Sequence, residues 1–496
     1  MAVLLFLLLG AIYALTAKGT LGISDSLFSL RTAQAIWQRG ALSLDTSEPD
    51  IKEAVTVHDG KAYSKYGIGL PLVWIPEVIA GERLAARFGF PPELVMRFLV
   101  SFYNVVFGAA ACVLAFYLAR FFKASITAAA AVALLLGLGT IAWRYSVWTF
   151  SEATQMFLVL GAVYGSVRDT PRSIVLGGAS FGYLILIKVF SVIYLPVFVA
   201  YALARSHPLG RPAMVRLARF LGPVAAAAVV LLVLNYVRFG NVFEAGYGGE
   251  AQRFSLADLP SHALTLLGSA DIGLFVYCPI LVLAIVGYVP MMRTARAEAL
   301  FLIGLILVNL FAAAAWYAYG CPWSWGPRFL VPTLPLYLLP LAGIPLDRKW
   351  KMLGVSAVAG LSIAVQVVGV LENNLEYVHI RDKVVSSEVR SGMPPILVGS
   401  AIILKHKILA GNNVYSLSEF GIDSGGTVDT SSEDTMVGLN LWYCHLARQL
   451  GKPALLKVPL VFLAAIGLLA VGLARALGFW HRRPGSRRLR IDSPGV

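Results

Sequence analysis

The sequence predicts an all-α polytopic membrane protein with about twelve transmembrane helices. Hydrophobic residues make up 58% of the 496-residue chain and charged residues only 14%, whereas an ordinary soluble domain is about 45–50% apolar and about 25% charged. The mean hydropathy is +0.74. The net charge is +14, but the basic residues fall in short segments on alternate sides of the apolar spans, as membrane orientation requires. The charge therefore does not indicate a nucleic-acid partner.

Apolar segments of about the length that a spanning helix needs recur along the chain. They cover residues 2–20, 94–119, 125–142, 150–167, 173–187, 189–204, 217–237, 272–292, 298–317, 328–345, 351–371 and 455–476. Lys188 lies between the fifth and the sixth segment, so residues 173–204 are predicted as two short helices or as one long kinked helix.

The basic residues predict the orientation. If the N-terminus is cytoplasmic, every cytoplasmic connection carries Arg or Lys, and the C-terminal tail adds HRRPGSRRLR. Both termini are therefore expected on the cytoplasmic side of a cell (inner) membrane. The first apolar run lacks a basic n-region and a good cleavage site, so it is expected to stay as an anchor.

This orientation places three large segments outside the membrane, at 21–93, 238–271 and 372–454. We expect a catalytic transmembrane module at 1–371 with its first outer loop at 21–93. A small extracytoplasmic cap is expected at 372–454, with acceptor selection as its role. The last helix and the basic cytoplasmic tail occupy 455–496. No internal repeat is visible, which disfavours a carrier built from two related halves.

The first outer loop begins with Asp25, which precedes apolar residues at helical spacing. The segment is expected to form an amphipathic helix in the membrane interface, with apolar residues Leu27, Leu30, Ala33, Ile36 and Trp37. Asp25 is either the N-cap of this helix or a carboxylate held at the membrane surface, and the two roles are compatible.

The same loop contains the segment HDGKAYSKYGIGLPLVWIP. Lys65 and its flanking tyrosines, Tyr63 and Tyr66, either anchor the protein to anionic lipid or bind the phosphate of one particular lipid. Glycines nearby would let backbone N–H groups approach that phosphate. The following LPLVWIPEVIAG is too short and too rich in proline to span, so it is expected in the interface or packed on the bundle.

Five motifs in this order resemble those of the membrane glycosyltransferases of the GT-C fold, which include dolichyl-phosphate-mannose-protein mannosyltransferases (glycosyltransferase family 39-like) and bacterial aminoarabinose transferases. They are SDSLFSLRTAQAIWQRG, YSKYGIGLPLVWIP, WTFSEATQMF, NYVRFGNVFEAGY and YGCPWSWGPRFLVPTLP. The resemblance covers residues 1–345. It implies a GT-C-like helical fold and transfer of a sugar from a polyprenyl-phosphate-linked donor.

The resemblance also implies roles for two acids. The base of the family corresponds to Asp25, and a second acid at the outer end of a span corresponds to Glu152, which is alternatively a first-turn acid favoured by the helix dipole. The family pattern has an acid directly after the first one, and this chain has Ser26. This departure weakens a metal-binding interpretation, so no metal ligands are predicted and metal dependence stays open. The sequence requires no other cofactor.

Transfer from a phosphate-linked sugar needs cations to stabilise the leaving phosphate and one carboxylate to deprotonate the acceptor hydroxyl. Lys65 and Arg328 are the first candidates for the phosphate, and Lys188 and Arg31 are further ones. Segment 235–247 either lines the site through Arg238, Asn241 and Glu244 or only closes a helix. The aromatic belt is the favoured role of Trp323 and Trp325, with stacking on a sugar as the alternative.

The function predicted first is therefore an outer-face glycosyltransferase, a hexosyl- or pentosyltransferase, that inverts the sugar. Its partners would be membrane lipid, a lipid-linked sugar and an acceptor glycan, lipid or protein. A transporter or lipid flippase, or a polymerase or ligase of lipid-linked glycans, are the alternatives. The four cysteines have no CxxC spacing, which excludes a zinc or dithiol motif. Two of them, Cys321 and Cys444, lie on the outer side, where a disulfide is permitted but two free thiols are the default.

Overall fold

The structure is a computed structural model that describes residues 1–21, 24–45, 55–206, 210–321, 323–383, 392–422, 427–430 and 438–478. The basic tail HRRPGSRRLR lies outside these residues. The described chain is mostly helical, as the fold class predicted, with two small two-stranded sheets that the all-α prediction did not include.

The N-terminal half contains α1 (Ala2–Thr16), α2 (Ser24–Arg39), β1 (Val55–His58), β2 (Lys61–Ser64), α3 (Gly69–Phe88), α4 (Pro92–Val100), α5 (Tyr103–Phe121), α6 (Ile126–Leu138), α7 (Ala142–Ser146), α8 (Glu152–Arg168), α9 (Pro171–Ile187), η2 (Val189–Tyr194), α10 (Leu195–Ala204) and α11 (Arg211–Phe239).

The C-terminal half contains η3 (Gly248–Arg253), α12 (Leu259–Gly268), α13 (Leu274–Tyr277), α14 (Ile280–Val286), α15 (Tyr288–Thr294), α16 (Arg296–Ala315), η4 (Arg328–Thr333), α17 (Leu334–Leu338), η5 (Leu339–Gly343), α18 (Lys349–Leu371), α19 (Asn374–Lys383), α21 (Ile396–Leu409), β3 (Val414–Ser416), η6 (Leu417–Phe420), β4 (Thr427–Asp429), α22 (Trp442–Gln449), η7 (Pro453–Lys457) and α23 (Val458–Ala476).

Five helical stretches in the described residues are long and apolar enough to cross a membrane. They are Pro92–Phe121, Arg211–Phe239, Arg296–Ala315, Lys349–Leu371 and Pro453–Ala476. Shorter apolar stretches are Ala2–Thr16, Ile126–Leu138, Pro171–Ile187, Val189–Ala204, Ile280–Thr294 and Arg328–Gly343. The helices support a polytopic membrane protein, and the count of about twelve spans stays a prediction.

Several predicted spans are interrupted helices. The chain leaves α9 at Lys188, whose backbone is extended (φ −141°, ψ 100°), so residues 173–204 form two helical pieces rather than one kinked helix. Prolines explain the other breaks, because proline cannot donate the next helical hydrogen bond. Pro332, Pro335 and Pro340 divide η4, α17 and η5.

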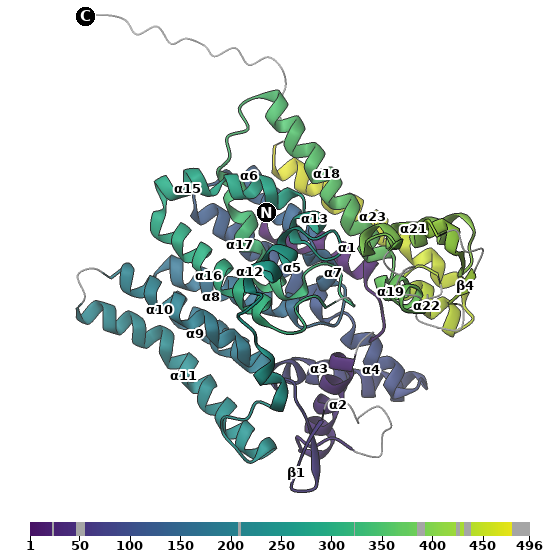
Figure 1. Ribbon diagram of the computed structural model, residues 1–496, viewed down its shortest axis with the longest axis horizontal. Coiled ribbons are helices and arrows are strands. Elements are labelled where there is room, and N and C mark those ends of the chain that lie inside the picture. Colours follow the sequence, from purple (N-terminus) through teal and green to yellow (C-terminus); the bar gives the residue numbers. More distant parts are fainter. Residues whose placement is uncertain are drawn as a thin grey trace, which may run out of the picture.

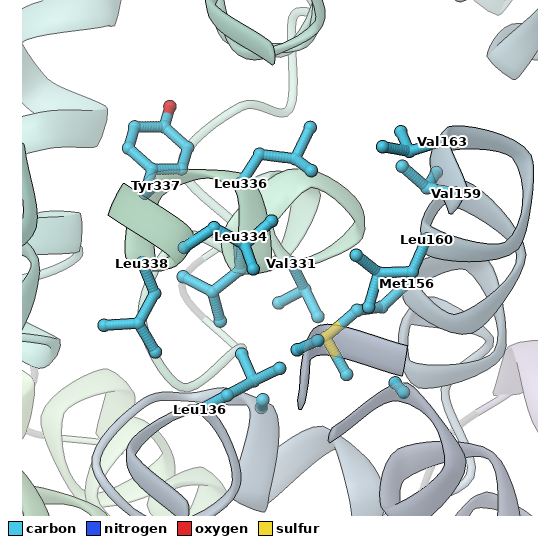
Figure 2. Packing of buried hydrophobic residues seen from close by; sticks show 14 of the residues in the cluster. Leu136, Met156, Val159, Leu160, Val163, Val331, Leu334, Leu336, Tyr337 and Leu338 are labelled. Carbon is cyan, nitrogen blue, oxygen red and sulfur yellow. The ribbon is translucent and has the colours of Figure 1, made fainter. Parts of the chain in front are cut away.

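The bundle core joins α8 to the broken helices η4 and α17. Figure 2 shows Met156, Val159 and Leu160 of α8 facing Val331 and Leu334 across a tightly filled space. Small residues bring α8 and α9 together, since a Cβ on Gly165 would lie 2.6 Å from Gly177 Cα. This packing fixes the N-terminus of α8 beside the N-terminus of η4.

The first outer loop folds as a compact unit on the bundle. Leu30 of α2, Trp74 and Val78 of α3 and Met96 of α4 form a separate buried cluster. The predicted amphipathic helix is present as α2, but Asp25 lies in its first turn and not at an N-cap position. LPLVWIPEVIAG is helical and packs against α2 and α4, with Pro76 inside α3.

The described residues of 372–454, which we call the cap, lie beside the bundle and carry α19, α21, α22 and the β3–β4 sheet (Figure 1). The cap has its own buried cluster, which includes Tyr377, Ile403 and Phe420. The carboxylate of Glu376 is its polar centre. It forms an ion pair with Lys407 and accepts hydrogen bonds from Asn413, Tyr415 and Thr430.

All four cysteines are free thiols, including Cys321 and Cys444. The alternative of a disulfide between these two is therefore not realised in the structure.

Glu376→Gln should unfold the cap locally. It removes the counter-ion of the buried Lys407 ammonium, which costs about 3 kcal/mol or more. Hydrogen exchange of residues 396–422 should increase strongly in the variant. The control is His406→Gln, which changes a surface contact of α21, the helix that carries Lys407. Equal exchange in wild type and Glu376→Gln would contradict a structural role for the carboxylate.

Candidate functional site

A polar pocket lies where the first outer loop meets the ends of α8, α9 and η4. Its volume is about 430 Å³, part of which is open to solvent. It is lined by Asp25, Ser26, Ser29, Tyr66, Gly67, Leu70, Thr149, Phe150, Ser151, Glu152, Ile187, Lys188, Tyr247 and Arg328. Five residues predicted as site residues from the sequence, Asp25, Tyr66, Glu152, Lys188 and Arg328, therefore share one cavity.

Arg328 joins the two candidate acids. Its guanidinium lies 3.3 Å from Asp25 Oδ2 and its Nε 2.9 Å from Glu152 Oε1. The guanidinium also lies over the Phe150 ring, 4.2 Å from the centroid. Glu152 Oε2 is buried without a hydrogen-bond partner. One cation thus holds two carboxylates that come from α2 and α8.

The Asp25 carboxylate is held ionised. Burial raises its pKa, but attraction to Arg328, the hydrogen bond that the Tyr66 hydroxyl donates at 2.7 Å and attraction to Lys188 outweigh burial, so the pKa lies below its usual value. Burial and the Asp25 charge raise the pKa of Tyr66. Tyr66 therefore stays a donor. The side chain of Asp25 is 33% exposed and that of Glu152 only 5%, so Asp25 is the carboxylate that a substrate can reach.

Lys188 supplies a second cation to the pocket. Its ammonium lies 3.4 Å from the Tyr247 hydroxyl and is attracted by Asp25 and Glu152. No carboxylate within the described ranges lies at salt-bridge distance from it. The break between α9 and η2 therefore places a cation without a salt-bridge partner in the pocket.

Lys65 lies at the edge of the site and already has an anionic partner. Its ammonium is 2.8 Å from Glu250 Oε1 in η3, and it lies 5.8 and 5.9 Å from the rings of Tyr66 and Tyr247. A Cβ on Gly246 would meet Lys65, and this glycine has φ +83°, so glycine lets the second outer segment approach.

The backbone around the site is fixed by hydrogen bonds between distant segments. The Ser26 hydroxyl donates to Thr149 Oγ1 at 2.7 Å, and Asn104 donates to the carbonyls of Trp148 and Phe150. Ser26, which replaces the second acid of the family pattern, therefore attaches α2 to the α7–α8 connection.

The glycines of the Lys65 segment pack against the protein itself. A Cβ on Gly67 would lie 2.3 Å from the Ile187 carbonyl oxygen, and one on Gly69 2.7 Å from the Ile187 side chain. We expected these glycines to approach a lipid phosphate, and the close approach that the structure shows is to the end of α9. It brings Tyr66 next to Lys188.

Two predicted site residues lie elsewhere. Tyr63 is buried on β2 and does not line the pocket. Arg31 lies about two turns along α2 from Asp25 and pairs with Glu93 at 3.1 Å.

Segment 235–247 acts mainly as a support. Arg238 donates to the backbone carbonyls of Ser64 and Tyr66, and Asn241 and Glu244 accept hydrogen bonds from N–H groups of their own loop. Tyr247, the pocket residue that sequence reasoning missed, stands at the end of the quoted motif but carries no charge that would single it out.

The two tryptophans near Arg328 differ in their exposure to solvent. Trp323 is exposed, whereas Trp325 is fully buried, edge-on to Tyr277 and 3.4 Å from Gln366. Trp325 is therefore a core residue and belongs neither to an aromatic belt nor to a sugar-stacking surface. The described residues contain no group of three His, Cys, Asp or Glu side chains that could hold a metal ion.

No protein-family model matches the sequence, and no curated protein matches it. Among solved structures, ArnT from Cupriavidus metallidurans bound to undecaprenyl phosphate is similar with a TM-score of 0.51 and 16% identity, over 83% of this chain and 71% of ArnT. The apo state of ArnT gives 0.47 at 16% identity, over 79% and 71%. The oligosaccharyltransferase AglB from Archaeoglobus fulgidus gives 0.43 at 13% identity, over 92% and 59%.

The likeness to ArnT shows that this chain has the fold of the GT-C membrane glycosyltransferases. The fold that the five sequence motifs implied is therefore confirmed.

Arg328→Gln should destabilise the protein by about 3 kcal/mol at pH 7, because it leaves two buried or half-buried carboxylates without their cation. Asp25, whose native pKa is lowered, stabilises the fold above its unfolded pKa of about 3.9 and loses this effect as pH falls through the native pKa. The difference in melting temperature between wild type and variant should therefore shrink from pH 7 to pH 4.

Adding Glu152→Gln to the Arg328→Gln variant should recover part of the lost folding stability, because it removes one of the two unpaired carboxylates. Arg31→Gln, which breaks a half-exposed pair, is the control and should cost about 1 kcal/mol or less. A pH-independent difference for Arg328→Gln would contradict the carboxylate pairing.

Proposed function

We propose that this protein transfers a sugar from a polyprenyl-phosphate-linked donor to an acceptor hydroxyl, with inversion at the anomeric carbon. The observation that carries the proposal is the pocket in which Arg328 bridges Asp25 and Glu152 beside the unpaired ammonium of Lys188. The GT-C fold supports it. ArnT, the protein with the similar structure, was solved with undecaprenyl phosphate, a lipid phosphate of the class that we propose as the carrier here.

The proposed reaction is a single displacement. The acceptor oxygen bonds to the anomeric carbon, the bond from that carbon to the phosphate oxygen breaks, and polyprenyl phosphate leaves with the electron pair. The hydroxyl proton passes to the base. The leaving phosphate needs no proton, so the protein must supply cations in a site shielded from water.

Lys188 is the first candidate for the phosphate contact in this proposal. Its ammonium lines the pocket and has no salt bridge within the described residues, so it can bind an anion without breaking a pair. Lys65, the residue favoured from the sequence, must first leave Glu250. Arg328 can share its guanidinium between its carboxylates and the phosphate, because it carries five donors.

Asp25 is the proposed base. It lines the pocket, is held ionised and is partly exposed, so an acceptor hydroxyl can reach it. Glu152 is nearly buried and pairs with Arg328 Nε, which suits a residue that orients Arg328.

The orientation of the chain completes the proposal. Residues 1–371 form the catalytic module with the site on the extracytoplasmic face, and both termini are cytoplasmic in a cell (inner) membrane. Residues 372–454 cap this face and 455–496 return the chain to the cytoplasm. About twelve spans fit this path if the interrupted and short helices also cross.

The test is sugar transfer by the purified protein, using a panel of polyprenyl-phosphate hexoses and pentoses with glycan, lipid and peptide acceptors. Asp25→Asn should reduce the turnover of the productive pair by about 10²–10⁴-fold, since it removes the base. Glu82→Gln, which changes a partly exposed acid of α3 that accepts hydrogen bonds from the far end of α2, should have wild-type activity. Full activity of Asp25→Asn would overturn the site, and movement of lipid without transfer from any donor would overturn the function.

Glu250→Gln should tighten donor binding. It removes the anion that competes for Lys65, so KM for the donor should fall while kcat changes little. Lys65→Gln should have the opposite effect on KM. The same KM in wild type and Glu250→Gln would contradict a competing role for this pair.

A further inference from the structure

The junction between the cap and the bundle contains buried polar groups that the proposed mechanism does not use. The chain leaves α18 at Leu371, whose carbonyl accepts a hydrogen bond from the Asn440 N–H, and Glu372 follows directly. On the bundle side lie Lys18 and Arg144. We call this junction the cap seam and define it by Lys18, Arg144, Glu372, Asn440 and His445.

Two cations in the cap seam are buried without an ion pair. Lys18 is 3% and Arg144 is 1% exposed. Both face the Trp148 ring, at 5.1 and 3.8 Å from its centroid, and Arg144 donates one hydrogen bond to Asn374. Neither side chain lies within salt-bridge distance of a carboxylate in the described part of the chain. A buried cation without a counter-ion is unfavourable.

Polar atoms around these cations are also unsatisfied. The buried atoms without a hydrogen-bond partner include Arg144 Nε, both carboxyl oxygens of Glu372, both amide atoms of Asn373 and of Asn440, Ser400 Oγ and His445 Nε2. Native proteins leave few such atoms, and a local group of them indicates a missing polar partner.

Glu372 does not neutralise the seam at neutral pH. Burial raises the pKa of its carboxyl to about 8, and the groups that face it are Lys18 before α2, Arg144 of α7, Glu376 of α19, and Ser400 and Lys407 of α21. Burial, Lys18 and the cap cations lower the pKa of His445 to about 3, so its ring is neutral. Burial and Arg144 lower the pKa of Lys18 to about 7. Arg144 therefore carries the permanent positive charge of the seam, and an anion bound there would favour the charged form of Lys18.

Two buried charges elsewhere in the described residues have several partners. Glu376, four residues beyond Glu372, pairs with Lys407 and accepts three further hydrogen bonds. Arg238 donates to two carbonyls and to Asn235. The contrast shows that the cap seam is not an ordinary structural ion cluster.

We propose that the cap seam is the closed form of an oxyanion-binding cleft, in which Lys18 and Arg144 bind a phosphate or carboxylate group of the acceptor when the cap moves away. The part about the acceptor rests on the proposed sugar transfer. Residues of α19, α21 and the β3–β4 sheet share their own hydrophobic cluster, so opening would mainly break the hydrogen bonds that Trp442 of α22 donates to Ala14 and Ala17. The polar atoms that closure leaves unpaired favour an open, hydrated state.

The seam is linked to the candidate site along the chain. Arg144 and Trp148 lie on the segment that ends in Thr149, Phe150 and Glu152 at the pocket. On the other side, Asn374 donates to the carbonyl of Trp323, five residues before Arg328. An anion held at Lys18 and Arg144 would therefore anchor an acceptor between the two loops that carry Glu152 and Arg328.

The test is hydrogen exchange of the full chain in neutral-lipid nanodiscs, with inorganic phosphate compared with chloride at the same ionic strength. Phosphate should change exchange in residues 371–380 and 438–448. Lys18→Met and Arg144→Met should each raise the half-maximal phosphate concentration at these segments by about tenfold or more, the effect of a lost charged hydrogen bond. Lys452→Met, which removes an exposed cap cation, should leave it unchanged.

Site-resolved exchange separates this cleft from the pocket, where phosphate can also bind. The variants should keep the melting temperature of the ligand-free wild type, since each loses an unpaired buried cation. No change at the seam in wild type, or the same change in Lys18→Met, would overturn the cleft. The same change caused by anionic lipid without phosphate would overturn its assignment to the acceptor. Because the measurement uses no donor, it is independent of the proposed transfer.

Discussion

The contact of Arg328 with Asp25 and Glu152 is the interaction on which the arrangement of the site depends. Three charges from α2, α8 and η4 meet in a pocket that is only partly open to solvent, and each would be unfavourable there alone. Neighbouring side chains fix the positions of these charges. Ser26 attaches α2 to Thr149, and Arg238 donates a hydrogen bond to the backbone that carries Tyr66. The packing of α8 against η4 and α17 (Figure 2) brings the two ends together.

The buried charges of this molecule differ in how many partners they have. Within the described residues, Glu376 and Arg238 have full sets of partners, whereas Lys188 in the pocket and Lys18 and Arg144 in the cap seam form no ion pair. Low dielectric makes such groups costly and makes them strong binding groups for anions. Lys188 lies between α9 and η2, whereas Lys18 follows α1 and Arg144 lies in α7.

Much of the site was predictable because membrane proteins place few charges in or near their spans. Asp25, Glu152, Lys188 and Arg328 each interrupt an apolar context, and all four line the pocket. Lys65 and Arg31 met the same criterion, but their partners Glu250 and Glu93 are 185 and 62 residues away in sequence. No local pattern reveals such pairs. Tyr247 was not predicted as a pocket residue, because an uncharged tyrosine is common at membrane interfaces.

The sequence by itself determined a helical membrane protein, and the order of its motifs implied the GT-C fold, because apolar length and charge placement are local properties of the chain. Only the tertiary structure decided which cations have no salt bridge within the described residues. It broke the chain at Lys188, turned Gly67 and Gly69 against Ile187 and buried Trp325. It also buried Lys18 and Arg144 beneath the cap without a salt bridge to a carboxylate in the described residues. The physical reason is that the state of a charge depends on the partners and the burial that distant segments provide.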